Sequence, residues 1–135
     1  MNTEEFMTEL KSGQYPPYKA MAMARERGTA CVRDLAAIAG DEKQKEVIRF
    51  WALSCIHWAG DDSDGTGVTT AVRLLNANAQ SVRVAALEVL QTLNPAIAEQ
   101  MAQQVLSDGS ERNNSSGDIH DTARRILNGK PSEKR

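Results

Sequence analysis

The hexapeptide Ile48-Arg49-Phe50-Trp51-Ala52-Leu53 recurs 34 residues later as Val82-Arg83-Val84-Ala85-Ala86-Leu87. A weaker copy, Ile119-His120-Asp121-Thr122-Ala123, aligns with the first five residues of the second hexapeptide. Each of the three segments lies in an amphipathic stretch that follows another amphipathic stretch. Repeats of this spacing are typical of helical solenoids, because one helix pair cannot bury its apolar face alone and stacked pairs share a continuous core.

The sequence around these repeats predicts an all-α fold. Alanine, the strongest helix former, is abundant, and apolar residues recur at helical spacing, as in Val47, Trp51 and Cys55. No run of four or more residues shows the strict alternation that is expected of a half-buried strand. We therefore expect seven to eight helices, arranged as a short α-solenoid of antiparallel helix pairs.

A single helical-repeat domain is expected over residues 1–129, followed by a flexible tail over residues 130–135. Its predicted parts are two N-terminal helices at 3–11 and 17–27 and three helix-pair units at about 29–60, 65–94 and 95–128. Glycine and proline residues separate the predicted helices. Thr29 and Asp41 are expected to cap the third and fourth helices, because their side-chain oxygens can accept hydrogen bonds from a first helical turn.

The pattern apolar-Arg-x-x-Ala-Leu, which opens the second helix of the pairs, resembles a HEAT repeat and implies a HEAT/armadillo-like architecture. More narrowly, residues 18–127 resemble the helical-repeat tail at the C-terminal end of some bacterial arylsulfatase-like proteins. The segments that carry this resemblance are AMAMARERG at 20–28, VIRFWAL at 47–53, AVRLL at 71–75 and SVRVAAL at 81–87. The chain departs from the HEAT pattern because the first-helix proline is missing, Asn78 replaces the turn acid, and His120 replaces the arginine of the third unit.

The resemblance reaches only a tail without catalytic residues. A sulfatase forms its nucleophile from the Cys or Ser of a Cys/Ser-x-Pro-x-Arg motif, beside acidic metal ligands. Cys31 is followed by Val-Arg-Asp and Cys55 by Ile-His-Trp, so neither has the required proline or arginine. The resemblance therefore implies a stand-alone relative of the tail, without the sulfatase reaction.

The composition is that of an ordinary globular protein. Apolar residues make up 41% and charged residues 25% of the 135 residues, and the net charge is −2. Such a charge gives no overall attraction to nucleic acid or to anionic lipid, so we expect neither as a partner. The longest uncharged apolar stretch, 50–60, is far shorter than the roughly 20 residues of a membrane span, and no export signal is visible. We expect a cytoplasmic protein if the chain is complete, and an exported one if it is a fragment of a sulfatase-like protein.

No residue pattern points to a catalytic, cofactor or metal site. Cys55 and His57 are two residues apart and would project about 200° apart from a helix. The acidic loop at 61–64 does not fit the EF-hand spacing and is expected to form a solvated turn. His57 and His120 lack the spacing of metal ligands. We therefore expect no enzyme, cofactor or metal, and a bridge between Cys31 and Cys55 stays open.

Binding of another protein is the function that the pattern favours, because solenoids commonly bind partners on the concave face formed by their second helices. The residues that we expect on that face are Arg49, Phe50, Leu53, His57, Trp58, Arg83, Leu87 and Gln91. Two interpretations of Arg49 and Arg83 stay open: they donate to carbonyls or acids of the neighbouring turn, or they form a basic ladder for phosphate. For Phe50, Trp51 and Trp58, core packing is the default, and an exposed Phe50 or Trp58 would be a candidate contact for a partner.

Two functional hypotheses follow. The first is a non-catalytic protein–protein interaction or scaffold module. The second is a small HEAT-like enzyme or nucleic-acid-binding protein, resembling a DNA glycosylase or a lyase. The second hypothesis needs a basic groove or a convergent acid/base set, and the sequence shows neither. The identity of the partner and the oligomeric state stay open.

Overall fold

A computed structural model describes residues 2–60, 65–107 and 119–128 of the chain. Within these ranges all regular secondary structure is helical and no strand is present, which confirms the predicted all-α class. The helices are α1 (Asn2–Leu10), α2 (Tyr18–Arg27), the 3-10 helix η1 (Gly28–Cys31), α3 (Val32–Ala39), α4 (Glu46–Ala59), α5 (Thr66–Leu74), α6 (Gln80–Leu93), α7 (Pro95–Ser107) and α8 (Ile119–Asn128). Among them, none has the length and apolar character that crossing a membrane requires.

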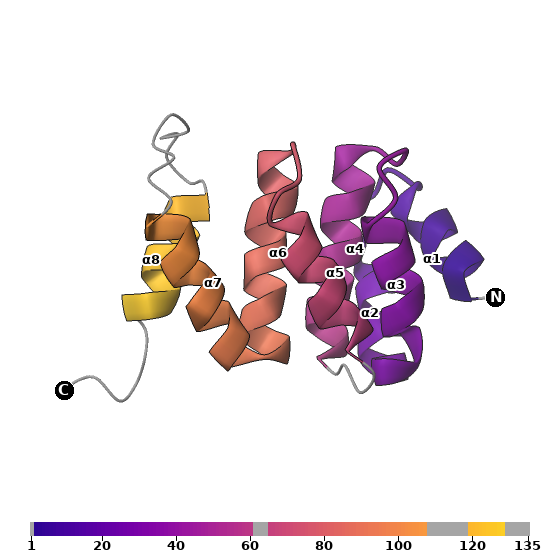
Figure 1. Ribbon diagram of the computed structural model, residues 1–135. Coiled ribbons are helices and arrows are strands. Elements are labelled where there is room, and N and C mark those ends of the chain that lie inside the picture. The colour runs from indigo at the N-terminus through magenta and orange to yellow at the C-terminus, as the bar shows by residue number, and fades with distance from the viewer. Residues whose placement is uncertain (1, 61–64, 108–118, 129–135) are drawn as a thin grey trace.

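The helices stand side by side in a row that runs from α1 to α8 (Figure 1). Consecutive helices pack against each other in α3–α4, α5–α6 and α7–α8. A second set of contacts joins α2 to α4, α4 to α6 and α6 to α8. As a result α4 and α6 are neighbours although α5 lies between them in the sequence (Figure 1). The helices α2, α4, α6 and α8 therefore form one layer of the molecule, and α3 and α5 belong to the other.

The sequence repeat is also a repeat of burial. The buried positions of α4 at Ile48, Ala52, Leu53, Cys55 and Ile56 correspond, 34 residues later, to the buried positions of α6 at Val82, Ala86, Leu87, Val89 and Leu90. The weaker third copy follows the same rule, since α8 buries Ile119, Ala123 and Ile126. Equivalent residues of these helices thus pack into one core, and the alanines among them let neighbouring helices approach closely.

The ends of α4 and α6 have clear local causes. Gly60 adopts a left-handed backbone conformation with φ of 69°, and its N–H donates to the carbonyl oxygen of Ile56, which ends α4. Asn94 ends α6 by donating its N–H to the carbonyl oxygen of Leu90. The side-chain oxygen of Asn94 accepts a hydrogen bond from the N–H of Ile97 at 3.2 Å, so the same residue caps α7.

The two predicted caps are wrong. Thr29 lies inside η1, and α3 begins after that 3-10 helix. Asp41 is separated from α4, whose first residue is Glu46. The Asp41 carboxylate instead accepts hydrogen bonds from the N–H of Lys43 at 3.0 Å and from the side-chain amide of Gln44 at 3.2 Å, and these bonds lower the pKa of that carboxyl group. Asp41 therefore stabilises the turn between α3 and α4. An Asp carboxylate accepts a hydrogen bond from the N–H two residues ahead in a turn as readily as it accepts one from the first turn of a helix.

Candidate partner-binding groove

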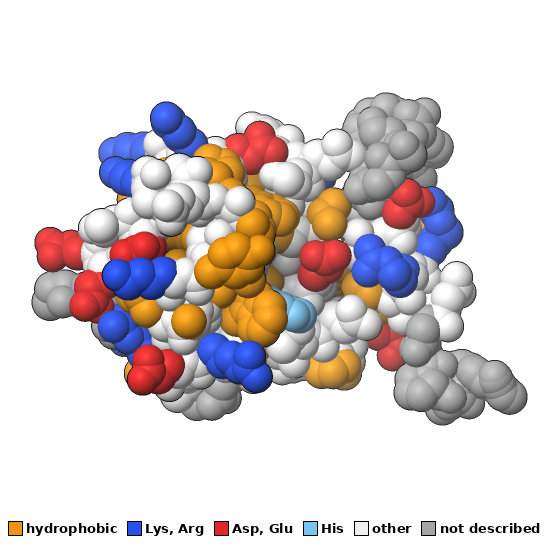
Figure 2. Space-filling model, turned by 180° about the vertical axis from the view of Figure 1, so that it is seen from behind, with side chains coloured by type: hydrophobic (Ala, Val, Ile, Leu, Met, Phe, Trp, Pro, Cys, Tyr) orange, Lys and Arg blue, Asp and Glu red, His pale blue; other side chains and the backbone are white. Residues whose placement is uncertain are grey.

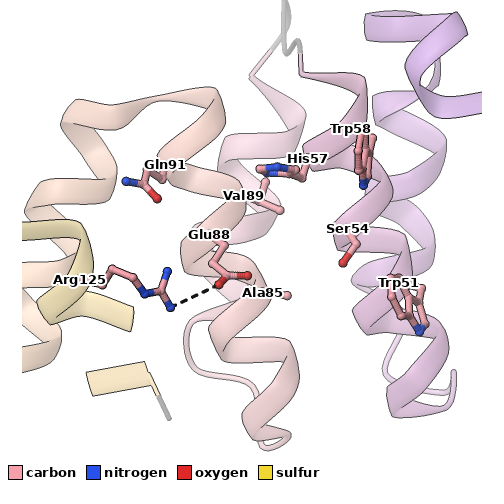
Figure 3. A pocket seen from close by; sticks show the side chains of 9 residues that line it. All are labelled: Trp51, Ser54, His57, Trp58, Ala85, Glu88, Val89, Gln91 and Arg125. Atoms are coloured by element: carbon pink, nitrogen blue, oxygen red, sulfur yellow. Dashed lines mark ion pairs between the residues drawn. The ribbon is translucent and has the colours of Figure 1, made fainter. Parts of the chain in front are cut away.

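A groove opens between α4 and α6 on the layer that also contains α2 and α8. It has a volume of about 340 Å³ and is lined by Trp51, Ser54, His57 and Trp58 of α4, by Ala85, Glu88, Val89 and Gln91 of α6, and by Arg125 of α8. The α4 and α6 side chains face each other across the groove, and Arg125 reaches it from α8 (Figure 3). We call this feature the α4–α6 groove.

Two tryptophans form the α4 wall of the groove. Trp51 and Trp58 are seven residues apart, so they lie on the same side of α4 and are separated by about 10 Å along its axis. Trp51 is half-buried: it stacks in parallel with Tyr15, with ring centroids 6.2 Å apart, and meets the edge of Phe50 at 4.9 Å. Trp58 is 42% exposed, and this is a large exposure for an indole ring. The α4 wall therefore presents one fixed and one accessible aromatic side chain, with Ser54 and His57 between them.

Two hydrogen bonds join α4 to α6 and fix the width between them. Near one end, Thr92 Oγ1 lies 2.7 Å from Nδ1 of His57. Near the other end, the hydroxyl of Ser81 donates to the carboxylate of Glu46 at 2.5 Å. Both pairs tie a residue of α4 to a residue of α6, so the groove between these helices is held at both ends.

Charged side chains border the aromatic wall. The guanidinium of Arg25, on α2, lies over the ring of Trp58 at 5.8 Å from its centroid. Across the groove, Arg125 and Glu88 are an ion pair at 3.7 Å (Figure 3). Figure 2 shows this face of the molecule: hydrophobic side chains gather in a band across its middle, with a histidine at the edge of the band and both basic and acidic side chains around it.

The structure brings only part of the predicted partner face to this groove. His57, Trp58 and Gln91 line it. Phe50 is half-buried and packs against Trp51 rather than lining the groove.

Leu53 and Leu87 were expected on the partner face, and that prediction is wrong for both. Each is fully buried in the core. The physical reason is the helical period: Leu53 follows Trp51 by two residues, so it points about 200° away from the tryptophan and into the core. The same offset separates Leu87 from Ala85 on α6.

Arg49 and Arg83 are also removed from the predicted face, and the interpretation that they fix neighbouring turns is confirmed. Arg49 is only 8% exposed, and its Nε donates to the carbonyl oxygen of Ala39, the last residue of α3, at 2.9 Å. Arg83 is half-buried and donates to the carbonyl oxygens of Ala77 and Asn78 at 2.7 and 3.1 Å. Arg49 thus binds the C-terminal end of α3 and Arg83 binds the turn before α6, instead of forming a basic ladder.

Sequence reasoning missed several groove residues. Trp51 was assigned to the core stripe alone, although Trp51, Ser54 and Trp58 share one helical face, a spacing that is visible in the sequence. Glu88 could have been found in the same way on α6, three residues before Gln91. Arg125 could not have been found by periodicity, because its place depends on how α8 packs against α6.

The groove contains residue types that also occur in hydrolases. Ser54, His57 and Glu88 all line it. Among the described residues, no hydrogen bond joins Ser54 to His57 or His57 to Glu88, and the imidazole of His57 is bonded to Thr92.

The two cysteines are unbridged and lie in the core, away from the groove. Burial raises the pKa of Cys55 to about 12, and the neighbouring Cys31 thiol adds to this effect. Burial also raises the pKa of Cys31. A thiol with a raised pKa stays protonated and is a poor nucleophile.

Within the described ranges, no group of three or more His, Cys, Asp or Glu residues is placed to hold a metal ion. The acidic loop at 61–64 lies outside the described residues, as does the tail at 130–135. Comparison with protein-family models, with curated proteins and with solved structures finds no match to this chain.

Proposed function

We propose that the protein is a non-catalytic helical-repeat module, a short α-solenoid of antiparallel helix pairs, that binds another protein through the α4–α6 groove. The observation that carries this proposal is the exposed Trp58, which lies two helical turns from Trp51 in a groove whose two helices are joined by hydrogen bonds near both ends. Tryptophan is among the residues that contribute most to protein–protein binding, because a large ring loses little conformational entropy when it is buried.

The repeat architecture is supported by three independent features. Burial recurs at the same offset as the sequence in α4 and α6. Arg49 and Arg83 make the same kind of contact with the backbone that precedes their helices. The contacts α2–α4, α4–α6 and α6–α8 give a continuous row of alternate helices. The proposal does not depend on the resemblance to sulfatase tails.

The groove also supports a binding role over a catalytic one. Its two tryptophans, set among polar and charged side chains, are of the residue types that are enriched at protein interfaces. The second hypothesis, a small enzyme or a nucleic-acid-binding protein, gains nothing from the groove, because His57 is engaged by Thr92 and the arginines at positions 49 and 83 bind backbone.

The proposal is tested by affinity enrichment from a lysate of the source organism with three immobilised forms of the chain. These are the unmodified protein, Trp58→Ala, and Gln103→Ala as a control on the exposed side of α7, which does not line the groove. Circular dichroism first checks that all three fold. We expect a protein that is enriched by the unmodified chain and by Gln103→Ala but not by Trp58→Ala. Equal enrichment by all three forms would contradict the role of the groove.

A further inference from the structure

We infer that the partner presents to the α4–α6 groove a short acidic segment that also carries large apolar side chains. The inference rests on the proposed function and adds the chemistry of the partner. Three features of the groove support it: the aromatic wall, the two arginines that border this wall, and the N–H donors of these arginines that are not used within the described residues.

The apolar requirement comes from the tryptophans. A volume of about 340 Å³ between Trp51 and the α6 wall holds roughly ten water molecules at liquid density. Ser54, His57, Glu88 and Gln91 offer hydrogen-bond partners to this water, whereas water against the indole rings, Ala85 or Val89 has fewer. Apolar side chains that replace this water gain affinity, and the two-turn spacing of Trp51 and Trp58 gives room for more than one of them.

The acidic requirement comes from Arg25 and Arg125. Arg25 lies against Trp58, and within the described part of the chain it forms no ion pair with a carboxylate. Among the described residues, Arg125 has the carboxylate of Glu88 at 3.7 Å, which is longer than a hydrogen bond, and the hydroxyl of Thr122 at 3.5 Å. Each guanidinium carries five N–H donors in a fixed fork that matches a carboxylate. Both arginines therefore retain donors for a carboxylate of the partner.

The balance of charge at the groove favours an anionic partner. Glu88 offsets one of the two arginines, and Arg124 on α8 is paired with Asp121. Arg25 has no opposing acid in the described residues, so the described border of the groove carries two arginines against one glutamate, although the chain as a whole has a net charge of −2. Charges farther away than about 8 Å are largely screened at physiological ionic strength, so this local excess favours an anionic partner.

The test begins with a library of random 12-residue peptides displayed on phage and selected on the immobilised full chain, with Trp58→Ala as the counter-target. We expect the enriched peptides to combine Asp or Glu with Trp, Phe or Leu. A fluorescein-labelled peptide of the consensus sequence is then titrated by anisotropy. Arg25→Glu and Arg125→Glu are each expected to weaken its binding by about 5-fold, whereas Lys43→Glu, an exposed change in the turn between α3 and α4, should leave affinity within 2-fold.

Each other outcome has a defined meaning. A neutral or basic consensus that still depends on Trp58 would overturn the acidic partner and leave the groove as a binding site. The absence of any peptide whose enrichment depends on Trp58 would overturn both this inference and the proposed function. Self-association of the unmodified chain that is lost in Trp58→Ala, measured by analytical ultracentrifugation, would assign the groove to a second copy and overturn the acidic partner.

Discussion

Replacing Arg49 with methionine should destabilise the protein far more than the same replacement of Arg83, although the two arginines are equivalent in the sequence repeat. Methionine keeps an unbranched apolar stem of similar length and removes the guanidinium. The comparison isolates the contribution of one buried contact, because Arg49 is 8% exposed and Arg83 is half-buried.

The expected magnitude follows from the contact that is lost. Arg49 Nε donates to the carbonyl oxygen of Ala39 at the C-terminal end of α3, away from water. A buried hydrogen bond to a charged group stabilises by about 1.5–3 kcal/mol, and the position at a helix C-terminus adds a favourable dipole interaction. Part of this is offset because the variant no longer buries a charge. We expect Arg49→Met to lower the free energy of unfolding by about 2 kcal/mol.

Arg83→Met removes hydrogen bonds to the carbonyl oxygens of Ala77 and Asn78 that water can replace, because this turn is partly exposed. A loss of about 0.5–1 kcal/mol is expected there. Urea titrations followed by tryptophan emission measure both values. With a slope of roughly 2 kcal/mol per molar urea, the midpoint should fall by about 1 M for Arg49→Met and by less than about 0.5 M for Arg83→Met. Equal shifts, or a larger shift for Arg83→Met, would refute the assignment of Arg49 as the buried contact.

Three further predictions concern packing, thiol chemistry and metals. Ala86→Leu should lower the free energy of unfolding by about 1–3 kcal/mol through overpacking, because Ala86 is fully buried. Ala96→Leu, on the exposed side of α7, is the control and should be nearly neutral in the same urea titration. An unchanged midpoint for Ala86→Leu would mean that the repeat register is wrong. Cys55, with its pKa raised to about 12, should resist Ellman's reagent at pH 8 until the chain is unfolded, and rapid labelling of the native protein would contradict its burial. Because the thiol loses its proton at a lower pH in the unfolded chain than in the folded one, the free energy of unfolding should fall as the pH rises from about 9 towards 12. Thermal melts in chelator and in millimolar calcium should coincide, since no ligand set is expected at residues 61–64, and a calcium-dependent shift of several degrees would make that loop a metal site.

The sequence predicted the helices well because helix formation depends on local patterns. The expected helices at 3–11 and 17–27 correspond to α1 and α2. The helical pattern predicted most buried positions of α4 and α6, such as Ala52 and Ala86, but it also placed Val47 in the core, and Val47 is exposed. The capping residues were less predictable. The Asp41 side chain can either cap a helix or stabilise a turn of the backbone next to it, and the residue type alone does not decide between the two.

The groove could be predicted only in part. The assignment of Leu53 and Leu87 to the partner face failed because the face was read as a continuous strip along each helix, whereas the helical period turns these leucines into the core. Arg125 and Arg25 were not found because they come from helices distant in sequence, and their approach to Trp58 and Glu88 depends on the packing of α2 and α8.

Photo-crosslinking in living cells of the source organism tests the central claim most directly. A benzoylphenylalanine residue is placed at position 91, on the α6 side of the groove, and in a separate variant at position 103, on the exposed side of α7. Irradiation should join the chain to a discrete protein from position 91 and not from position 103, with the attachment site in an acidic segment of that protein. Crosslinks of equal yield from both positions, or none from position 91, would contradict a partner-binding groove between α4 and α6.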